Sequence, residues 1–324
     1  MSVAVELPPL TADEAGHSAQ VAERVRAEIA RGGGWISFAR YMQMALYEPG
    51  LGYYSAGARK FGGAGDFVTA PEVAPVFSRC LAGQCAGILG DLGGGDVLEL
   101  GAGSGAMAAA MLTEFERLGR LPSRYLILDL SAELRERQRT TLEQAVPHLL
   151  GRVEWLEPLP QGFEGGVLAH GVLAAPPGRP VAVPGGAVQA LGVTEHFGRF
   201  EWSEVRASPQ LRELVERIAA EAGEGWPDGY VSEVNAGLGP WTNAMASALA
   251  RGVMLFVDYG LPRREYYSPE RSTGTLLCHF RHRFHDDPFD RPGLQDITAW
   301  VDFTAMAEAA VAAGLEVAGY TTQA

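Results

Sequence analysis

The sequence contains little cysteine, a single lysine and no long apolar run. Its 324 residues include 3 cysteines, and Lys60 is the one lysine among 26 basic residues. Three cysteines without a CxxC pair match neither a zinc site nor a disulfide framework, and they fit buried thiols in a reducing compartment. No stretch approaches the roughly 18 apolar residues of a membrane span. We therefore expect a cytoplasmic protein without a membrane segment.

The charge balance is strongly acidic. The 39 acidic and 26 basic residues give a formal net charge of -13. This charge repels nucleic-acid phosphates and anionic lipids, so neither is expected as a partner, and a cationic partner is favoured. The acidic first residues, without an apolar stretch, also argue against a signal peptide. A hydrophobic fraction of 47% allows one large globular domain or two.

Helices alternate with short apolar strands from residue 75 onward. The predicted helices are 75–90, 105–118, 131–145, 208–222, 240–250 and 303–313, and the predicted strands are 96–100, 124–129, 152–156, 166–169, 253–258 and 315–320. This alternation predicts a parallel sheet covered by helices. In segments 188–193 and 199–205, apolar and polar residues alternate as they do in strands. The two segments therefore predict an inserted hairpin. Upstream, helices at 17–31 and 38–46, the second capped by Ser37, precede a long loop over 51–74.

A glycine-rich loop follows the first strand of the predicted sheet. Gly101, Gly103 and Gly105 come directly after the strand and before a helix rich in Ala and Met. Glycines let the backbone turn sharply and approach a ligand, and the start of a helix offers free N–H groups. The spacing GxGxG differs from the dinucleotide pattern and is similar to the S-adenosylmethionine loop of class I methyltransferases. Asp129 is the last residue of the next predicted strand, where a carboxylate can accept hydrogen bonds from both hydroxyls of a ribose. The alternative interpretation of the loop is a bare dinucleotide site.

Longer strings of the sequence resemble the MidA family, whose mitochondrial members are arginine methyltransferases acting on a subunit of respiratory complex I during its assembly. The matching strings lie at residues 36–39, 52–55, 65–72, 98–105, 257–260, 274–276, 296–298 and 301–303. The most specific of them is GDFVTAPE, from Gly65 to Glu72. The resemblance implies a class I methyltransferase fold, S-adenosylmethionine as methyl donor, a protein arginine as acceptor and, here, a bacterial cytoplasm.

The resemblance also sets the expected architecture. We expect an α/β protein with a Rossmann-like class I methyltransferase sheet, a helical N-terminal extension and an inserted β-hairpin region. Residues 1–74 would form the N-terminal helices and a loop covering the cofactor, and residues 75–324 the methyltransferase domain, with an insertion at about 174–236. The family continues past Gln323 into a seventh, antiparallel strand. Without that strand, an exposed sheet edge or a partner such as a second copy of the chain is expected.

The same resemblance implies which side chains form the site. Glu99 would contact the methionine ammonium group, and the loop residues Asp66, Thr69 and Glu72 would close over the cofactor, although Thr69 could instead cap the helix that follows. Lys60 could reach the methionine carboxylate or remain solvated. The expected cofactor-binding residues are Asp66, Thr69, Pro71, Glu99, Gly101, Gly103, Gly105, Asp129 and Ser131. The catalytic candidates are Glu72, His170 and Asp258, the last of which could also be a structural cap.

The segment after the fourth strand departs from the family pattern. The family has Asn-Glu followed three places later by Asp-Ala, whereas this chain has His170, Gly171, Val172, Leu173, Ala174 and Ala175. A guanidinium needs a carboxylate to orient it and to help remove its proton, and both family carboxylates are missing. His170 could replace one of them as a base. Two alternatives to an arginine methyltransferase therefore remain: a non-catalytic assembly factor and a small-molecule methyltransferase.

A loop rich in His and Arg is predicted before the helix at 303–313, and its histidines raise the question of a metal site. His279, His282 and His285 do not have the spacing of a zinc-binding helix, and arginines separate them. We therefore expect no metal, and we expect these side chains to line the entrance for the acceptor.

Overall fold

The computed structural model describes residues 7–56, 69–174, 178–223 and 225–323. They form two compact units, each described by itself. The parallel-sheet unit comprises Arg59–Leu173 and Asn243–Asp258, and the antiparallel unit comprises Met1–Ala58, Ala174–Thr242 and Tyr259–Ala324. The division expected from the sequence, at residue 74 with an insertion at about 174–236, stays a prediction.

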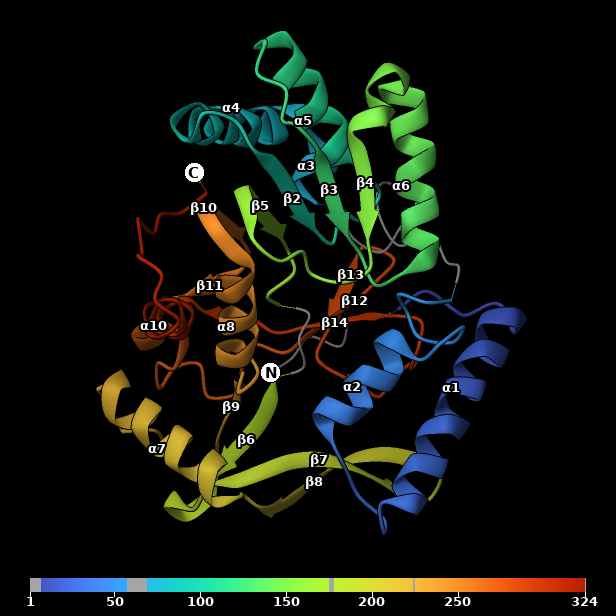
Figure 1. Cartoon of the computed structure of the whole chain (residues 1–324). Coiled ribbons are helices and arrows are strands. Elements are labelled where there is room, and N and C mark those ends of the chain that lie inside the picture. The colour runs from blue at the N-terminus through green and yellow to red at the C-terminus, as the bar shows by residue number, and fades with distance from the viewer. Residues whose placement is uncertain (1–6, 57–68, 175–177, 224, 324) are drawn as a thin grey trace. The chain divides into compact units, whose positions relative to one another are not determined.

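The parallel-sheet unit is built on five parallel strands in the order β10-β5-β2-β3-β4 (Figure 1). The strands are β2 (Asp96–Leu100), β3 (Tyr125–Leu128), β4 (Val153–Leu156), β5 (Phe163–His170) and β10 (Leu249–Val257). The helical elements are α3 (Ala70–Val73), α4 (Pro75–Leu92), α5 (Ala106–Arg117), α6 (Ala132–Ala145) and the short η1 (Pro147–Arg152). The predicted alternation is confirmed, and the carboxyl ends of all five strands meet at one edge.

The core of this unit lies between the sheet and the helices α4 and α5. It is formed by buried apolar side chains, among them Cys85, Met111, Phe115, Val97 and Ile127. Because β2 and β3 are short runs of apolar residues buried on both faces, they occupy the centre of the sheet, as is typical of parallel strands.

Glycines allow two strands to begin very close to their neighbours. Gly165 in β5 has a φ of 146°, and a Cβ at this position would collide with the carbonyl oxygen of Asp96 in β2. Gly252 in β10 has a φ of 149°, and its Cβ would collide with the carbonyl oxygen of Gly165. Only glycine fits such an approach of two backbones.

The antiparallel unit contains several smaller sheets. One sheet has the order β1-β7-β6-β9, with β8 paired to β7; β13-β12-β14 form a second sheet and β11-β15 a third. The strands are β1 (Ile36–Ser37), β6 (Arg179–Val183), β7 (Gln189–His196), β8 (Arg199–Arg206), β9 (Tyr230–Val234), β11 (Gly260–Leu261), β12 (Leu277–Phe280), β13 (Arg283–His285), β14 (Asp296–Thr298) and β15 (Val301–Asp302). The helical elements are α1 (Ala12–Arg31), α2 (Phe38–Tyr47), η2 (Pro184–Gly186), α7 (Pro209–Ala222), α9 (Arg263–Tyr266) and α10 (Phe303–Ala312), while α8 (Leu238–Ala248) contains the boundary between the units.

Local sequence signals account for the helices of this unit. Thr11 and Glu14 form a capping box at the start of α1, and Ser37 accepts a hydrogen bond from the backbone N–H of Arg40, as predicted for the cap of α2. The predicted hairpin is confirmed as β7 and β8, which are paired along their full length.

Two expectations about the C-terminal third are wrong. The segment before α10, rich in His and Arg, was expected to be a loop but contains β12 and β13. Residues 315–320, expected to be a strand, form none, because no strand in the described residues pairs with them and their side chains are mostly exposed. A strand needs a neighbour for its backbone hydrogen bonds.

A buried arginine connects three elements of the antiparallel unit. Arg263 in α9 is 5% exposed and pairs with Asp302 at 3.2 Å, with Glu308 at 2.5 Å and with Glu221. Asp302 also caps α10 by accepting a hydrogen bond from the backbone N–H of Ala305. Burial alone would lower the pKa of Arg263, but its hydrogen bonds to Glu308 and Asp302 raise it overall. The guanidinium therefore stays charged and fixes α9 to the start of α10.

Among the described residues, no helix combines the length and apolar character that crossing a bilayer requires. The same part of the chain holds no cluster of three or more His, Cys, Asp or Glu side chains arranged to bind a metal ion.

Candidate active site

The glycine loop lies at the carboxyl end of β2. Gly101, Gly103 and Gly105 have φ angles of 63°, 55° and 83°, a region that glycine adopts without strain. A Cβ at Gly101 would meet the side chain of Val172 at 3.1 Å, and one at Gly105 would meet the backbone of Gln138 at 3.0 Å. The loop therefore turns sharply between β2 and the start of α5, where helix N–H groups are free to bind a ligand.

Helix α6 fixes the glycine loop to the end of β3. Asp129, 8% exposed, accepts hydrogen bonds from the backbone N–H of Ser131 at 2.9 Å and from Nε2 of Gln138 at 2.7 Å. Gln138 is fully buried, and its Nε2 also donates to the carbonyl oxygen of Gly103 at 3.2 Å. Its Oε1 accepts a hydrogen bond from the indole of Trp155. This one amide thus holds the carboxylate and the loop in a fixed relation.

Glu99 lies in β2, two residues before the glycine loop. It is 1% exposed, and its Oε2 accepts a hydrogen bond of 2.5 Å from the hydroxyl of Tyr125. Burial raises the pKa of Glu99 to about 7, the bond from Tyr125 opposes this rise, and the charge of Asp129 adds to it. Asp129 is therefore near enough for the two carboxylates to influence each other.

The ends of β5 and β10 lie beside this loop along the same edge. His170 ends β5, and its ring lies against that of Phe77 with centroids 5.1 Å apart. Burial lowers the pKa of His170 below its usual value, so the imidazole is neutral at pH 7. Asp258 follows β10 and accepts a hydrogen bond of 2.8 Å from the backbone N–H of Leu173. Gly171 has a φ of 66°. The segment after β5 is thus held in shape by Asp258.

Helix α3 carries Glu72 and packs against α5. Oε2 of Glu72 is buried, and no described residue forms a hydrogen bond with it. A buried carboxylate oxygen without a partner is unfavourable unless a cation or a donor reaches it. Glu72 is therefore available to a ligand or substrate.

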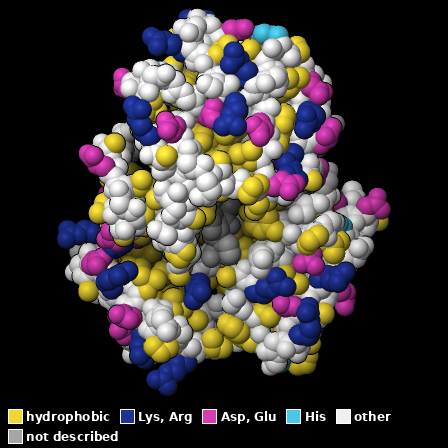
Figure 2. Space-filling model, in the orientation of Figure 1, with side chains coloured by type: hydrophobic (Ala, Val, Ile, Leu, Met, Phe, Trp, Pro, Cys, Tyr) yellow, Lys and Arg dark blue, Asp and Glu magenta, His cyan; other side chains and the backbone are white. Residues whose placement is uncertain are grey.

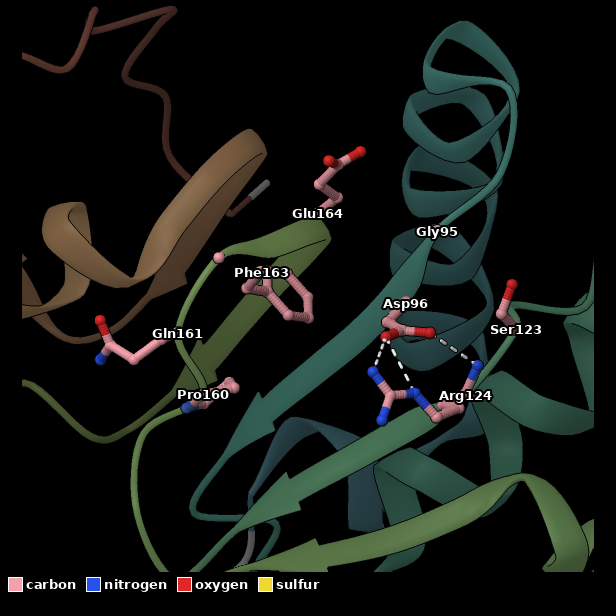
Figure 3. Close-up of a pocket in the computed structure, with 9 residues that line it drawn as sticks. Gly95, Asp96, Ser123, Arg124, Pro160, Gln161, Phe163 and Glu164 are labelled. Carbon is pink, nitrogen blue, oxygen red and sulfur yellow. Dashed lines mark hydrogen bonds and ion pairs between the residues drawn. The ribbon is translucent and has the colours of Figure 1, made fainter.

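A pocket of about 450 Å³ lies at the opposite edge of the sheet (Figure 3). Asp96, Arg124 and Phe163 line it, at or next to the amino ends of β2, β3 and β5, and Asp96 is paired there with Arg124. Ligands of open α/β sheets bind at the carboxyl ends of the strands. We therefore expect a ligand at the glycine loop and not in this pocket.

Comparisons with known proteins identify the family of this chain. Residues 80–321 match the model of a family described as "Putative S-adenosyl-L-methionine-dependent methyltransferase". The chain belongs to this family. It is therefore an S-adenosylmethionine-dependent methyltransferase, and the resemblance to the MidA proteins is confirmed.

Individual relatives support the assignment. A crystal structure of a protein from Burkholderia thailandensis, bound to S-adenosyl-homocysteine, is 45% identical with a TM-score of 0.91, over 95% of this chain and 80% of that one. The protein arginine methyltransferase NDUFAF7 homolog, mitochondrial, of Drosophila melanogaster is 28% identical over 90% of this chain and 69% of its own length. The mitochondrial NDUFAF7 of Danio rerio is 28% identical over 84% and 67%. The class I methyltransferase fold is thereby confirmed.

The structure brings most of the methyltransferase's expected site residues to one sheet edge. Gly101, Gly103, Gly105, Asp129 and His170 lie at the ends of β2, β3 and β5. Their individual roles stay predictions. The chain's own groups fit S-adenosylmethionine, because a glycine cradle, a helix start and a carboxylate at the next strand end lie together.

Other predicted residues have more local contacts. Ser131 caps α6 by accepting a hydrogen bond from the backbone N–H of Leu134, and Pro71 lies in the first turn of α3. Thr69 precedes α3, but its side chain makes no capping hydrogen bond, so the interpretation of Thr69 as a side-chain cap is wrong. Asp66 and Lys60 lie outside the described residues.

Three residues of the candidate site are not identified by the sequence analysis. Gln138 and Thr141 lie on one face of α6, and Thr141 donates a hydrogen bond of 2.7 Å to the carbonyl oxygen of Ser104 in the loop. Their spacing of three on the helix after Asp129 is the signal that could have found them. Leu130 follows Asp129 and is 85% exposed. An exposed apolar side chain next to Asp129 offers a surface for a planar ligand group.

Proposed function

We propose that this methyltransferase transfers the methyl group of S-adenosylmethionine to an arginine side chain of a protein, such as a subunit of a respiratory complex. The observation that carries the donor part is the junction of the glycine loop with Asp129 through Gln138. The structurally similar Burkholderia protein binds S-adenosyl-homocysteine, the product of such a transfer. The arginine acceptor is supported by the names of the mitochondrial relatives and by the net charge of -13.

The acidic net charge does not form a single patch on the face drawn in Figure 2. On the face drawn in Figure 2, acidic and basic side chains are interspersed. We therefore assign recognition of the guanidinium chiefly to the partly buried Glu72, whose Oε2 is buried and has no hydrogen-bond partner among the described residues. A charge-assisted hydrogen bond to such an oxygen is stronger than one at the surface.

The chain's own groups have distinct tasks in this proposal. When bound, S-adenosylmethionine supplies an electrophilic methyl group on a positive sulfonium. Asp129 accepts hydrogen bonds from the ribose hydroxyls of the cofactor. The glycine loop offers backbone N–H groups to the methionine end of the cofactor. His170, neutral at pH 7, accepts the proton that the acceptor nitrogen loses. Asp258 holds the segment that follows His170 through the N–H of Leu173. Positioning of the two reactants supplies most of the rate enhancement.

Asp129→Asn tests the cofactor site. The substitution keeps the shape of the side chain but removes the charge that strengthens hydrogen bonds to the ribose. Because a hydrogen bond to a charged group contributes about 1.5–3 kcal/mol, we expect affinity for S-adenosyl-homocysteine to fall roughly tenfold to a hundredfold in calorimetry. Asp91→Asn, on the exposed end of α4, is the matched control and should bind like the wild type. Equal affinity of both variants would refute the assignment of Asp129.

His170→Ala tests the base. We expect kcat to fall by roughly a hundredfold while affinity for S-adenosyl-homocysteine is unchanged, since only proton transfer is lost. Burial lowers the pKa of His170, so the wild-type rate should persist as the pH falls through 6.5, the ordinary histidine value. His148→Ala, at an exposed site in η1, is the control. A kcat that His170→Ala leaves intact would exclude His170 as the base.

A non-catalytic assembly factor is the second candidate function. It is favoured by Gly171 and Ala174, which stand where the family has carboxylates. The two functions are separated by incubating the purified chain with S-adenosylmethionine and arginine-containing proteins or peptides, followed by mass spectrometry. Arginine methylation supports the enzyme. Tight cofactor binding without methylation of any arginine supports the assembly factor.

A further inference from the structure

Tyr125 is the first residue of β3 and does not belong to the glycine loop. Its ring is fully buried in the core, and its hydroxyl donates a hydrogen bond of 2.5 Å to Oε2 of Glu99. The sulfur of Met111 in α5 lies 3.6 Å from the same hydroxyl. A hydroxyl in an apolar core needs an acceptor, and a carboxylate acceptor gives a charge-assisted bond. The Tyr125–Glu99 pair is therefore a specific polar contact inside the core.

The contact with Tyr125 involves only one of the two oxygens of the Glu99 carboxylate. Oε2 is bound to Tyr125, whereas Oε1 has no hydrogen-bond partner among the described residues. The side chain is 1% exposed and stands two residues before Gly101. A nearly fully buried carboxylate with one free oxygen beside a ligand loop is unfavourable without a cationic partner. The feature thus points to a ligand that brings a positive charge.

The charge state of Glu99 depends on its surroundings. Burial raises its pKa to about 7, the Tyr125 hydrogen bond opposes that rise, and the charge of Asp129 at the end of β3 adds to it. On α4, Cys85 also faces Tyr125, but burial raises the pKa of its thiol to about 12 and it stays neutral. From α5, the uncharged Met111 contacts the pair. Ionisation of Glu99 near neutral pH is therefore set first by its burial and then by Tyr125 and Asp129.

We propose that Tyr125 is a positioning residue for cofactor binding, which holds the Glu99 carboxylate so that its free oxygen receives the ammonium group of the bound cofactor. The proposal rests on the proposed function, because it needs the cofactor at the glycine loop. The ammonium group binds the ionised carboxylate, so a protonated Glu99 must release its proton on binding. Affinity therefore rises with pH through about 7. Without the Tyr125 hydroxyl, the ionised form is less favoured, and the rise moves to higher pH.

The test measures the affinity for S-adenosyl-homocysteine by calorimetry from about pH 5.5 to 8.5. Tyr125→Phe should shift the midpoint upward by about one unit, bind roughly fivefold more weakly at pH 7, and approach wild-type affinity at the alkaline end. Glu99→Gln should bind weakly with a flat profile. Tyr267→Phe, which removes a buried hydroxyl bonded to a backbone carbonyl in the other unit, should match the wild type. Titration of the ligand itself is common to all four proteins and cancels in the comparison.

The outcomes separate the two proposals. A Tyr125→Phe midpoint equal to that of the wild type overturns the role of Tyr125, and so does an affinity loss that is the same at every pH. If Tyr125→Phe does not fold, Glu99→Gln decides: a profile as steep as that of the wild type overturns the proposal, and a flat one supports it. A wild-type chain that binds no S-adenosyl-homocysteine at any pH refutes the cofactor site itself.

Discussion

Replacing Gly165 by alanine is expected to lower the free energy of unfolding by roughly 3–5 kcal/mol, because strain at a φ suited to glycine adds to overpacking. The φ of 146° is unfavourable for alanine, and the new Cβ would collide with the carbonyl oxygen of Asp96 in the neighbouring strand. Backbone atoms in the centre of a sheet cannot move aside as a flexible side chain can. The measurement is chemical denaturation of the full chain, with hydrogen exchange of the β2 and β5 amides as the local readout.

The adjacent glycine supplies the control. A Cβ at Gly166 would lie 3.5 Å from the sulfur of Cys85, an ordinary van der Waals contact, and its φ is not in the region that favours glycine. Gly166→Ala should therefore change stability by less than about 1 kcal/mol. If the two variants are equally stable, the close approach of β5 to β2 does not limit which side chain residue 165 can carry.

Removing the buried arginine of the antiparallel unit is expected to have an effect of similar size. Arg263→Ala leaves the Asp302 carboxylate, with its side chain 8% exposed, without the guanidinium that offsets its burial. Loss of one partner of a buried ion pair lowers stability by about 3–5 kcal/mol. Burial already raises the pKa of Asp302, although the contact with Arg263 opposes this. Without that contact, the pKa should rise further.

The pH dependence distinguishes this mechanism from a simple loss of packing. A carboxyl whose folded pKa lies above its unfolded value stabilises the fold at low pH, and this stabilisation disappears as the pH rises through the folded pKa. The stability deficit of Arg263→Ala should thus be smaller in acid and larger near neutrality. Arg212→Ala, which removes an exposed partner of Glu216, should change stability by less than about 1 kcal/mol. A deficit that does not vary with pH would indicate lost packing alone.

The parallel sheet was predictable because its signals are local. The strand predicted at 96–100 is β2 (Asp96–Leu100), and the helix predicted at 131–145 is α6 (Ala132–Ala145), since short buried strands and capped helices are encoded by neighbouring residues. The strands β6, β9 and β12 were not predicted. Each has only four or five residues and depends on partners distant in the sequence.

The positions of part of the candidate site were predictable, while the roles of its residues stay predictions. The glycine loop and Asp129 follow from spacing along the chain, because each comes directly after an apolar strand. Gln138 and Tyr125 were not found, since a buried amide or hydroxyl has no recognisable pattern until its acceptor is known. The acceptors are the carboxylates of Asp129 and Glu99, and only the folded sheet brings them within hydrogen-bonding distance.

The left-handed backbone at Gly171 limits how the acceptor side of this protein could change. Its φ of 66° is compatible with the hydrogen bond from its N–H to the carbonyl oxygen of Val257, and a side chain there has open space but an unfavourable backbone. A glutamate placed at this position alone would lose roughly 1–2 kcal/mol to that conformation. A carboxylate at residue 171 is therefore unfavourable unless the backbone after β5 changes together with the substitution. Such an exchange would thus change the stability of the fold as well as the chemistry of this sheet edge.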